Sequence, residues 1–137
     1  MGLSIKRVNY YHTTIEDHHG KGYWLLELFR QKGINLQAFV AFPRGGGKSQ
    51  IDFVVDDIEK LRQVAILANI ELVGPKRGFM AQGEDEVGAI VDLHQKLTAA
   101  AINIHAGCGL SAGEGRFSYL FWVKSDDYET AAATLGI

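Results

Sequence analysis

The sequence repeats itself at a spacing of 68 residues, and this repeat constrains the fold more than any other feature. Asp17 and Gly20 recur as Asp85 and Gly88 at this spacing. The other matches in the same register are Glu16 with Glu84, Leu25 with Leu93, Phe29 with Leu97, Ile34-Asn35-Leu36 with Ile102-Asn103-Ile104, Ala38 with Ala106, Phe53 with Phe121, and Val55 with Val123. Because no gap is needed until after Val55, we interpret the chain as two copies of one folding unit.

The copies meet at Gly74-Pro75-Lys76, a combination typical of a turn, so we predict domains at residues 1–74 and 75–137. Hydrophobic periodicity predicts the order strand, helix, strand, strand, helix, strand in the first copy. The expected strands are 8–15, 34–42, 51–55 and 70–73, and the expected helices are 21–32 and 58–68, the second capped by Asp56 or Asp57. The second copy repeats this order over 77–82, 87–100, 101–109, 115–124 and 126–135.

The predicted fold class is α+β, with two ferredoxin-like βαββαβ units in tandem, the second of which lacks its last strand. That strand would flank residues 79–82, whose edge carries no charge and would otherwise be open. Residues 70–73 of the first unit could cover the edge. Tyr23 and Leu26 add apolar helix surface outside the core, so we favour covering by a second copy of the chain and expect a homodimer.

Composition excludes several classes of function. The net charge is −2, and the 14 Lys and Arg residues are scattered among 16 acidic ones, so we expect no nucleic-acid partner. No apolar run is long enough for a membrane span, and we expect no membrane partner. The single cysteine, Cys108, cannot form an internal disulfide, which favours a reducing cytoplasm.

The repeated D-x-x-G motif lies between an expected strand and an expected helix. Backbone N–H groups at a helix start are free and favour an anion, and glycine lets another group approach the backbone closely. Such a loop could hold an amino acid, with the carboxylate of the ligand at the N–H groups and its ammonium near Asp17.

D-x-x-G after a strand, an apolar helix and then Gly33-Ile34-Asn35-Leu36 resembles the ACT domain over nearly the whole chain, as two tandem copies. The resemblance implies a non-catalytic regulatory protein that binds an amino acid or similar metabolite where the loop of one module faces a neighbouring module. It implies the following ligand-binding residues: Asp17, His18, His19, Gly20 and Asn35 in the first copy, and Asp85, Glu86, Val87, Gly88 and Asn103 in the second. A Pro often precedes the motif glycine in that family, whereas His19 and Val87 stand there in this chain, which leaves the ligand open.

The histidines raise a metal-dependent alternative. Glyoxalase-like enzymes are also paired modules, and one could use His12 with carboxylates. However, the repeat places Met80 at the position equivalent to His12, and helices interrupt where that fold needs three consecutive strands. His18 and His19 are adjacent and point different ways in a turn, and His105 and Cys108 form a poor chelating pair. We therefore expect no metal and no cofactor.

Two further motifs indicate structure rather than chemistry. Gly45-Gly46-Gly47-Lys48-Ser49 resembles the end of a phosphate-binding loop, but Phe42 stands where the first glycine is required and a strand follows. We predict a hairpin tip instead. Cys108 lies between two glycines without a base on its own face of the strand, so a catalytic thiolate is not expected.

Overall fold

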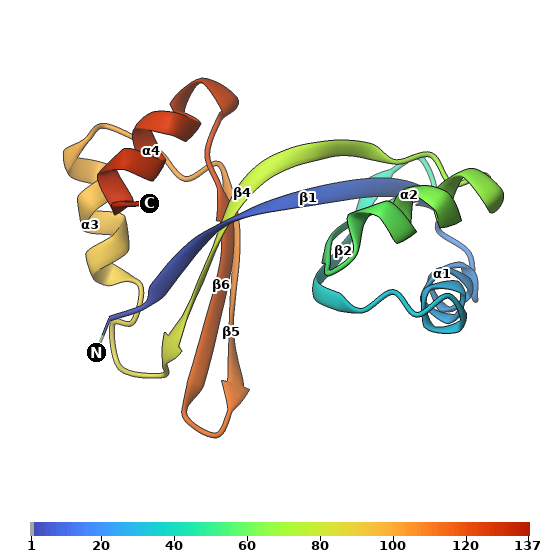
Figure 1. Ribbon diagram of the computed structural model, residues 1–137, viewed down its shortest axis with the longest axis horizontal. Helices are drawn as coiled ribbons and strands as arrows, with labels where there is room; N and C mark the ends of the chain where they lie inside the picture. The colour runs from blue at the N-terminus through green and yellow to red at the C-terminus, as the bar shows by residue number, and fades with distance from the viewer. Residues whose placement is uncertain (1) are drawn as a thin grey trace. The chain divides into compact units, whose positions relative to one another are not determined.

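The computed structural model describes residues 2–137, which form six strands and four α-helices (Figure 1). The strands are β1 (Ser4–Glu16), β2 (Leu36–Gly45), β3 (Lys48–Val55), β4 (Val73–Glu84), β5 (Ala106–Gly113) and β6 (Arg116–Trp122). The helices are α1 (Lys21–Gln31), α2 (Ile58–Leu67), α3 (Val91–Ala99) and α4 (Tyr128–Leu135), with a short 3-10 turn, η1 (Ser125–Asp127), before α4. The predicted α+β class is confirmed.

The chain divides into two compact units. We call Tyr10–Lys76 the first unit, and residues 2–9 together with Arg77–Ile137 the second unit. The boundaries fall inside β1 and β4, so each of these long strands contributes one part to each unit.

The first unit has the strand order β2-β3-β1-β4. β3 is antiparallel to both of its neighbours, and Phe53 pairs with Tyr11 of β1 and with Phe39 of β2. One face of these strands packs with α1 and α2 around Leu25, Phe29, Ile34, Ile51, Phe53, Val55, Leu61 and Val64. Asp57 caps α2 as expected, since its carboxylate accepts from the backbone N–H of Lys60 at 3.0 Å.

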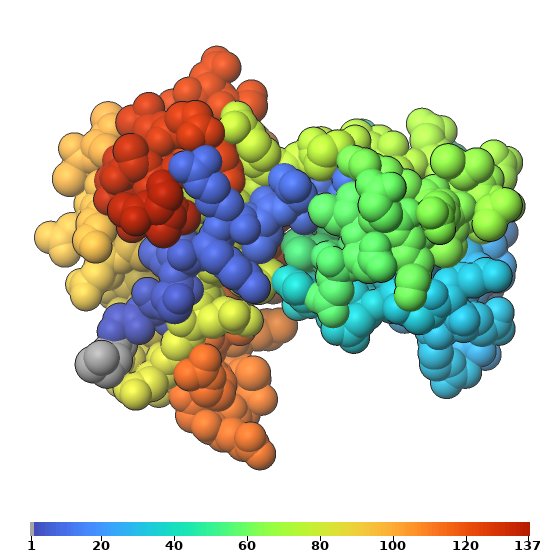
Figure 2. Space-filling view, in the orientation of Figure 1, coloured from blue at the N-terminus to red at the C-terminus, as the bar shows by residue number. Residues whose placement is uncertain are grey.

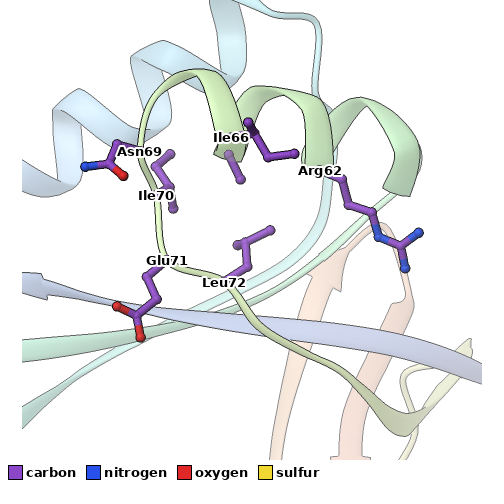
Figure 3. A pocket seen from close by; sticks show the side chains of 7 residues that line it. Arg62, Ile66, Asn69, Ile70, Glu71 and Leu72 are labelled. Carbon is purple, nitrogen blue, oxygen red and sulfur yellow. The ribbon is translucent and has the colours of Figure 1, made fainter.

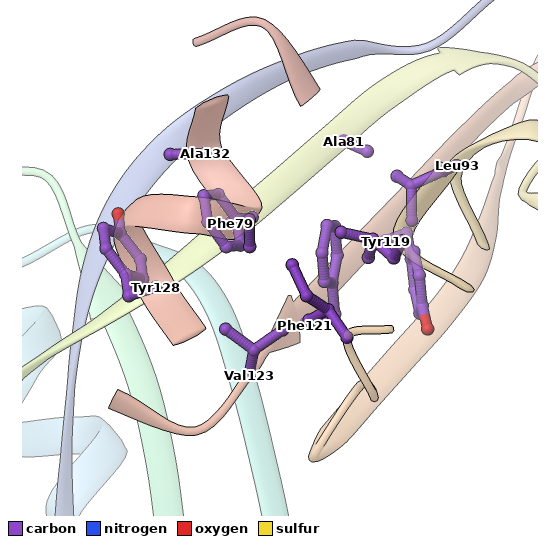
Figure 4. Packing of buried hydrophobic residues seen from close by; sticks show 11 residues of the cluster. Phe79, Ala81, Leu93, Tyr119, Phe121, Val123, Tyr128 and Ala132 are labelled. Atoms are coloured by element: carbon purple, nitrogen blue, oxygen red, sulfur yellow. The ribbon is translucent and has the colours of Figure 1, made fainter. Parts of the chain in front are cut away.

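The second unit has the strand order β1-β4-β6-β5. Its core centres on Phe79, whose ring stacks on that of Tyr128 with 4.7 Å between ring centroids (Figure 4). The centroid of the Phe79 ring lies 5.3 Å from that of Phe121. Tyr119 continues the stack beyond Phe121 at 4.9 Å. These aromatic rings, with residues of α3 and α4, hold the helices on one face of the strands.

The start of β1 provides the strand that the second copy lacks. β1 lies next to β4, and Leu3 and Ile5 pack against the core of the second unit. The backbones of β1 and β4 approach so closely here that a Cβ on Gly83 would lie 3.1 Å from the carbonyl oxygen of Gly2 and 3.3 Å from Leu3 Cα. In Figure 2 the N-terminal segment, in blue, lies against α4, in red. The expectation that a second chain or residues 70–73 cover the edge at residues 79–82 is therefore wrong. The covered edge no longer provides a reason to expect a homodimer.

The connection between the copies also differs from its prediction. Gly74-Pro75-Lys76 lies inside β4 rather than in a linker turn, and residues 70–72 precede the strand. The chain needs glycine at position 74 because an added Cβ would lie 2.8 Å from Tyr11 Cδ2, where β4 crosses close to β1.

Candidate functional site

The two strand-to-helix loops, residues 17–20 and 85–88, are anchored by the same backbone hydrogen bond. The N–H of Asp17 donates to the carbonyl of Gly47 at 2.7 Å, and the N–H of Asp85 donates to the carbonyl of Gly115 at 2.8 Å. In each unit the acceptor lies at the tip of the hairpin between the two following strands. The expected hairpin tip at residues 45–47 therefore serves as the support of the first loop.

The helix that follows begins differently in the two loops. Gly20 and Gly88 both adopt the left-handed region, with φ of 88° and 75°. α1 begins at once, at Lys21, whereas α3 begins only at Val91. No side chain caps α1, and the N–H groups of Gly22 and Tyr23 have no hydrogen-bond partner among residues 2–137. The first loop thus presents a helix N-terminus that is free to bind an anion.

The aspartates of the two loops also differ, because only one of the two carboxylates has a hydrogen-bond partner. Asp85 Oδ2 accepts from Ser111 Oγ at 2.9 Å. The carboxylate of Asp17 has no hydrogen-bond or ion-pair partner within the described part of the chain. The neighbouring His18 is exposed and forms an ion pair with Glu16, Nε2 to Oε2, at 3.0 Å. Only the first loop therefore combines a free carboxylate with free backbone N–H groups.

The asparagines named with these loops lie at the opposite end of each unit. Glu16 pairs with Lys48 at one end of β3, whereas Leu36, next to Asn35, pairs with Val55, seven positions later. At about 3.3 Å per residue this separation is about 23 Å. Asn35 Nδ2 instead donates to Asp56 Oδ2 at 3.1 Å.

The second unit repeats this separation. Glu84 pairs with Arg116 at one end of β6, whereas Ala106, three residues after Asn103, pairs with Trp122 at the other end. Neither asparagine can therefore meet the loop of its own unit.

His12, the residue of the metal-dependent alternative, lies in a cationic environment. Its Nδ1 is 3.3 Å from Lys76 Nζ, and burial, followed by the charge of Lys76, lowers the pKa of the imidazole. Asp52, its partner across the strands, is buried and accepts from Gln50 Nε2 at 2.8 Å. An ammonium beside the ring nitrogen opposes a metal cation. Within residues 2–137 there is no cluster of three or more His, Cys, Asp or Glu side chains that could hold a metal.

A shallow depression of about 660 Å³ lies beside α2 in the first unit (Figure 3). Its lining residues are Arg62, Ala65, Ile66, Asn69, Ile70, Glu71 and Leu72. The guanidinium of Arg62 is already engaged by Glu59 Oε1 at 3.0 Å and by Tyr11 Oη at 3.4 Å. The motifs and periodicity of the sequence do not predict this surface. The one available signal was Ile66, an apolar residue off the buried stripe of α2, whose side chain is 80% exposed.

Comparison with solved structures identifies the fold. A protein of Bacteroides thetaiotaomicron, BT0572, matches with a TM-score of 0.80 at 12% identity, over 97% of this chain and 88% of that chain. The regulatory subunit of aspartate kinase from Thermus thermophilus matches with a TM-score of 0.66 at 16% identity, over 98% and 95%. The aspartate kinase of Clostridium acetobutylicum, described as an allosteric enzyme, matches with a TM-score of 0.57 at 14% identity, over 97% of this chain and 34% of that chain.

At these identities the likeness establishes the fold alone, which is shared with regulatory subunits of aspartate kinase. No family model matches the sequence, and no curated protein matches it. None of the helices in residues 2–137 has the length and apolar character to cross a membrane.

Proposed function

We propose that this chain is a non-catalytic regulatory module of two ferredoxin-like units, which binds a free amino acid or similar small metabolite at the loop 17–20. The single observation that supports the proposal is that the same loop region has both a free carboxylate, on Asp17, and free backbone N–H groups, on Gly22 and Tyr23. A free amino acid carries an ammonium and a carboxylate a few ångströms apart. It can therefore offer the ammonium to Asp17 and the carboxylate to the helix N-terminus.

The second loop, residues 85–88, is less suited to bind a ligand. Ser111 occupies the Asp85 carboxylate, and α3 begins after an extra turn rather than directly after Gly88. Glu86 and Val87 are exposed and replace the two histidines of the first loop. Loop 85–88 is thus the weaker ligand site of the two, and its aspartate serves to fix the hairpin of the second unit.

The site is fully exposed in one chain, and the sharing of the fold with a regulatory subunit of aspartate kinase supports an assembly that completes it. We infer a cytoplasmic homodimer in which a second copy covers the loop. Any contribution of Asn35 or Asn103 to the ligand would come from that neighbour, because neither reaches the loop of its own unit.

A thermal-shift screen against the free amino acids tests the function. A ligand that binds only the folded state stabilises it by RT ln(1 + [L]/Kd), about 2.7 kcal/mol at a hundredfold excess over Kd. We expect one amino acid, or a small set of related ones, to raise Tm at millimolar concentration. The absence of any shift over the whole set would contradict amino-acid binding.

A further inference from the structure

A smaller crevice of about 200 Å³ opens in the first unit between β1, α1 and the segment that leads into β4. It is lined by Thr13, Thr14, Ile15, Trp24, Leu25, Asn69, Ile70 and Glu71. It shares no residue with the loop 17–20. Its volume lies below that of pockets for drug-sized ligands, so an occupant would have only a few heavy atoms.

Thr13 gives the first sign that a polar ligand belongs in this crevice. Its side chain is only 3% exposed, and its hydroxyl has no hydrogen-bond partner among residues 2–137. No buried side-chain nitrogen or oxygen among the described residues lacks a hydrogen-bond partner, so the Thr13 hydroxyl reaches the surface of the crevice rather than being sealed in the core. A ligand with an N–H donor could replace water at this hydroxyl.

The charge of the lining residues favours a positively charged ligand. Glu71 is the one charged side chain of the lining, and its carboxylate has no partner among the described residues. Figure 3 shows Glu71 and Asn69 extending to the side of the segment opposite Arg62. The crevice therefore offers a carboxylate and other oxygen acceptors without a competing cation.

An aromatic side chain completes this set of groups. Trp24 is 47% exposed at the crevice, and the face of an indole ring attracts cations. Ile15, Leu25 and Ile70 provide an apolar lining for a short hydrocarbon chain.

We propose that this crevice binds the ammonium group of a small primary alkylamine. The ammonium donates to the carboxylate of Glu71 and to the hydroxyl of Thr13, and the alkyl chain lies against Trp24 and the apolar lining. This site stands independently of the proposed amino-acid site, since its polar groups come from β1 and the segment 69–71 rather than from the loop.

The test is an NMR titration of the full chain with n-butylammonium, butanol and butyrate, which share one chain length and differ in charge. The chain has two tryptophans, so the indole N–H signal of Trp24 reports the crevice and that of Trp122 serves as an internal control. We expect saturable shifts of the Trp24 signal with butylammonium at millimolar concentration. We expect at least about tenfold weaker binding of butanol, and none of butyrate.

Variants separate this site from its surroundings. Glu71→Gln and Thr13→Val should each weaken butylammonium binding by about tenfold or more, and Thr13→Val keeps the shape of the side chain. Glu59→Gln, on the exposed side of α2, and Asp17→Asn, in the loop, should leave it unchanged. Butanol binding as tightly as butylammonium, an unaltered affinity of Glu71→Gln, or no saturable shift at all would overturn the proposal. A loss in Asp17→Asn would also overturn its independence from the loop.

Discussion

Arg7 in β1 donates to the carboxylate of Glu129 in α4 at 3.1 Å, although 122 positions separate them in the chain. Arg77 in β4 donates to the same carboxylate at 2.9 Å, and both guanidinium groups lie over the ring of Tyr128. Arg7 also donates to the backbone carbonyl of Ile137 at 3.1 Å. The start of the chain is thus joined to the last helix of the second unit, which is folded from both ends of the sequence.

The apolar contacts of the start of β1 should contribute more to stability than these exposed ion pairs. Ile5 packs on the core of the second unit, whereas Lys6 points to solvent. We predict that Ile5→Asp lowers the free energy of unfolding by about 2–4 kcal/mol, because it loses apolar burial and places a charge at the core. Lys6→Ser, on the other face of the same strand, should change it by less than about 0.5 kcal/mol. Urea denaturation checks both, and equal effects would show that residues 2–9 do not complete the second unit.

The glycine-rich strand β5 should tolerate no side chain at position 107. A Cβ on Gly107 would lie 2.8 Å from Tyr119 Oη, and that hydroxyl is held at 3.0 Å from His94 Nε2. We predict that Gly107→Ala destabilises the chain by about 1–3 kcal/mol through overpacking. Gly22→Ala, in α1 with open space around it, should instead stabilise by about 0.5–1 kcal/mol. A neutral Gly107→Ala in thermal unfolding would mean that the Tyr119 ring does not cover this strand.

The elements that could be predicted from the sequence are those in which periodicity and local signals agree. The predicted helix 21–32 is observed as Lys21–Gln31, and Asp57 caps α2. The repeat extends to the backbone, since Asp17 and Asp85 make equivalent hydrogen bonds. The helix and its cap follow from short-range chemistry within one segment. The equivalent hydrogen bonds join residues 30 positions apart, so they follow from the repeat of the whole unit.

The contribution of the start of β1 to the second unit could not be predicted from such local signals. Leu3 and Ile5 continue the alternation of β1, but Arg7 interrupts it in the sequence. The contact of the Arg7 guanidinium with the ring of Tyr128 exists only in the folded chain. Gly74-Pro75 is a turn signal in sequence, yet it lies inside β4. The need for glycine at position 74 comes from the close approach to Tyr11, which exists only in the folded chain. The sequence motif groups Asn35 with the loop 17–20, whereas the strand register separates the two by the length of β3.

The stability of the chain should fall in acid through His12. Burial and Lys76 lower the pKa of His12, while Asp52 partly opposes them. The unfolded state therefore binds the proton more readily, and the contribution of His12, complete above the unfolded pKa of about 6.5, is lost as pH falls through the folded pKa. We predict that Lys76→Met raises the pKa of His12 in an NMR titration and reduces the decline in stability between neutral and mildly acidic pH. A His12 pKa at or above its usual value in the wild-type chain would contradict this account.

The two loop aspartates should differ in their effect on the ligand-free fold. Asp85 accepts from Ser111 and fixes the hairpin of the second unit, whereas Asp17 has no partner among the described residues. We predict that Asp85→Ala lowers the free energy of unfolding by about 0.5–1.5 kcal/mol and that Asp17→Ala leaves it nearly unchanged. Chemical denaturation without ligand measures both, and a larger loss in Asp17→Ala would show that this carboxylate is structural.

Calorimetric titration of the amino acid found in the screen into wild type, Asp17→Asn and Asp85→Asn tests whether the loop 17–20 is the amino-acid site. An ammonium left without its carboxylate partner costs about 2 kcal/mol or more, which corresponds to about a 30-fold loss of affinity. We predict this loss of affinity in Asp17→Asn, with the ligand-free stability preserved, and wild-type affinity in Asp85→Asn. Equal affinity of Asp17→Asn and wild type would contradict the assignment of the loop 17–20 as the amino-acid site.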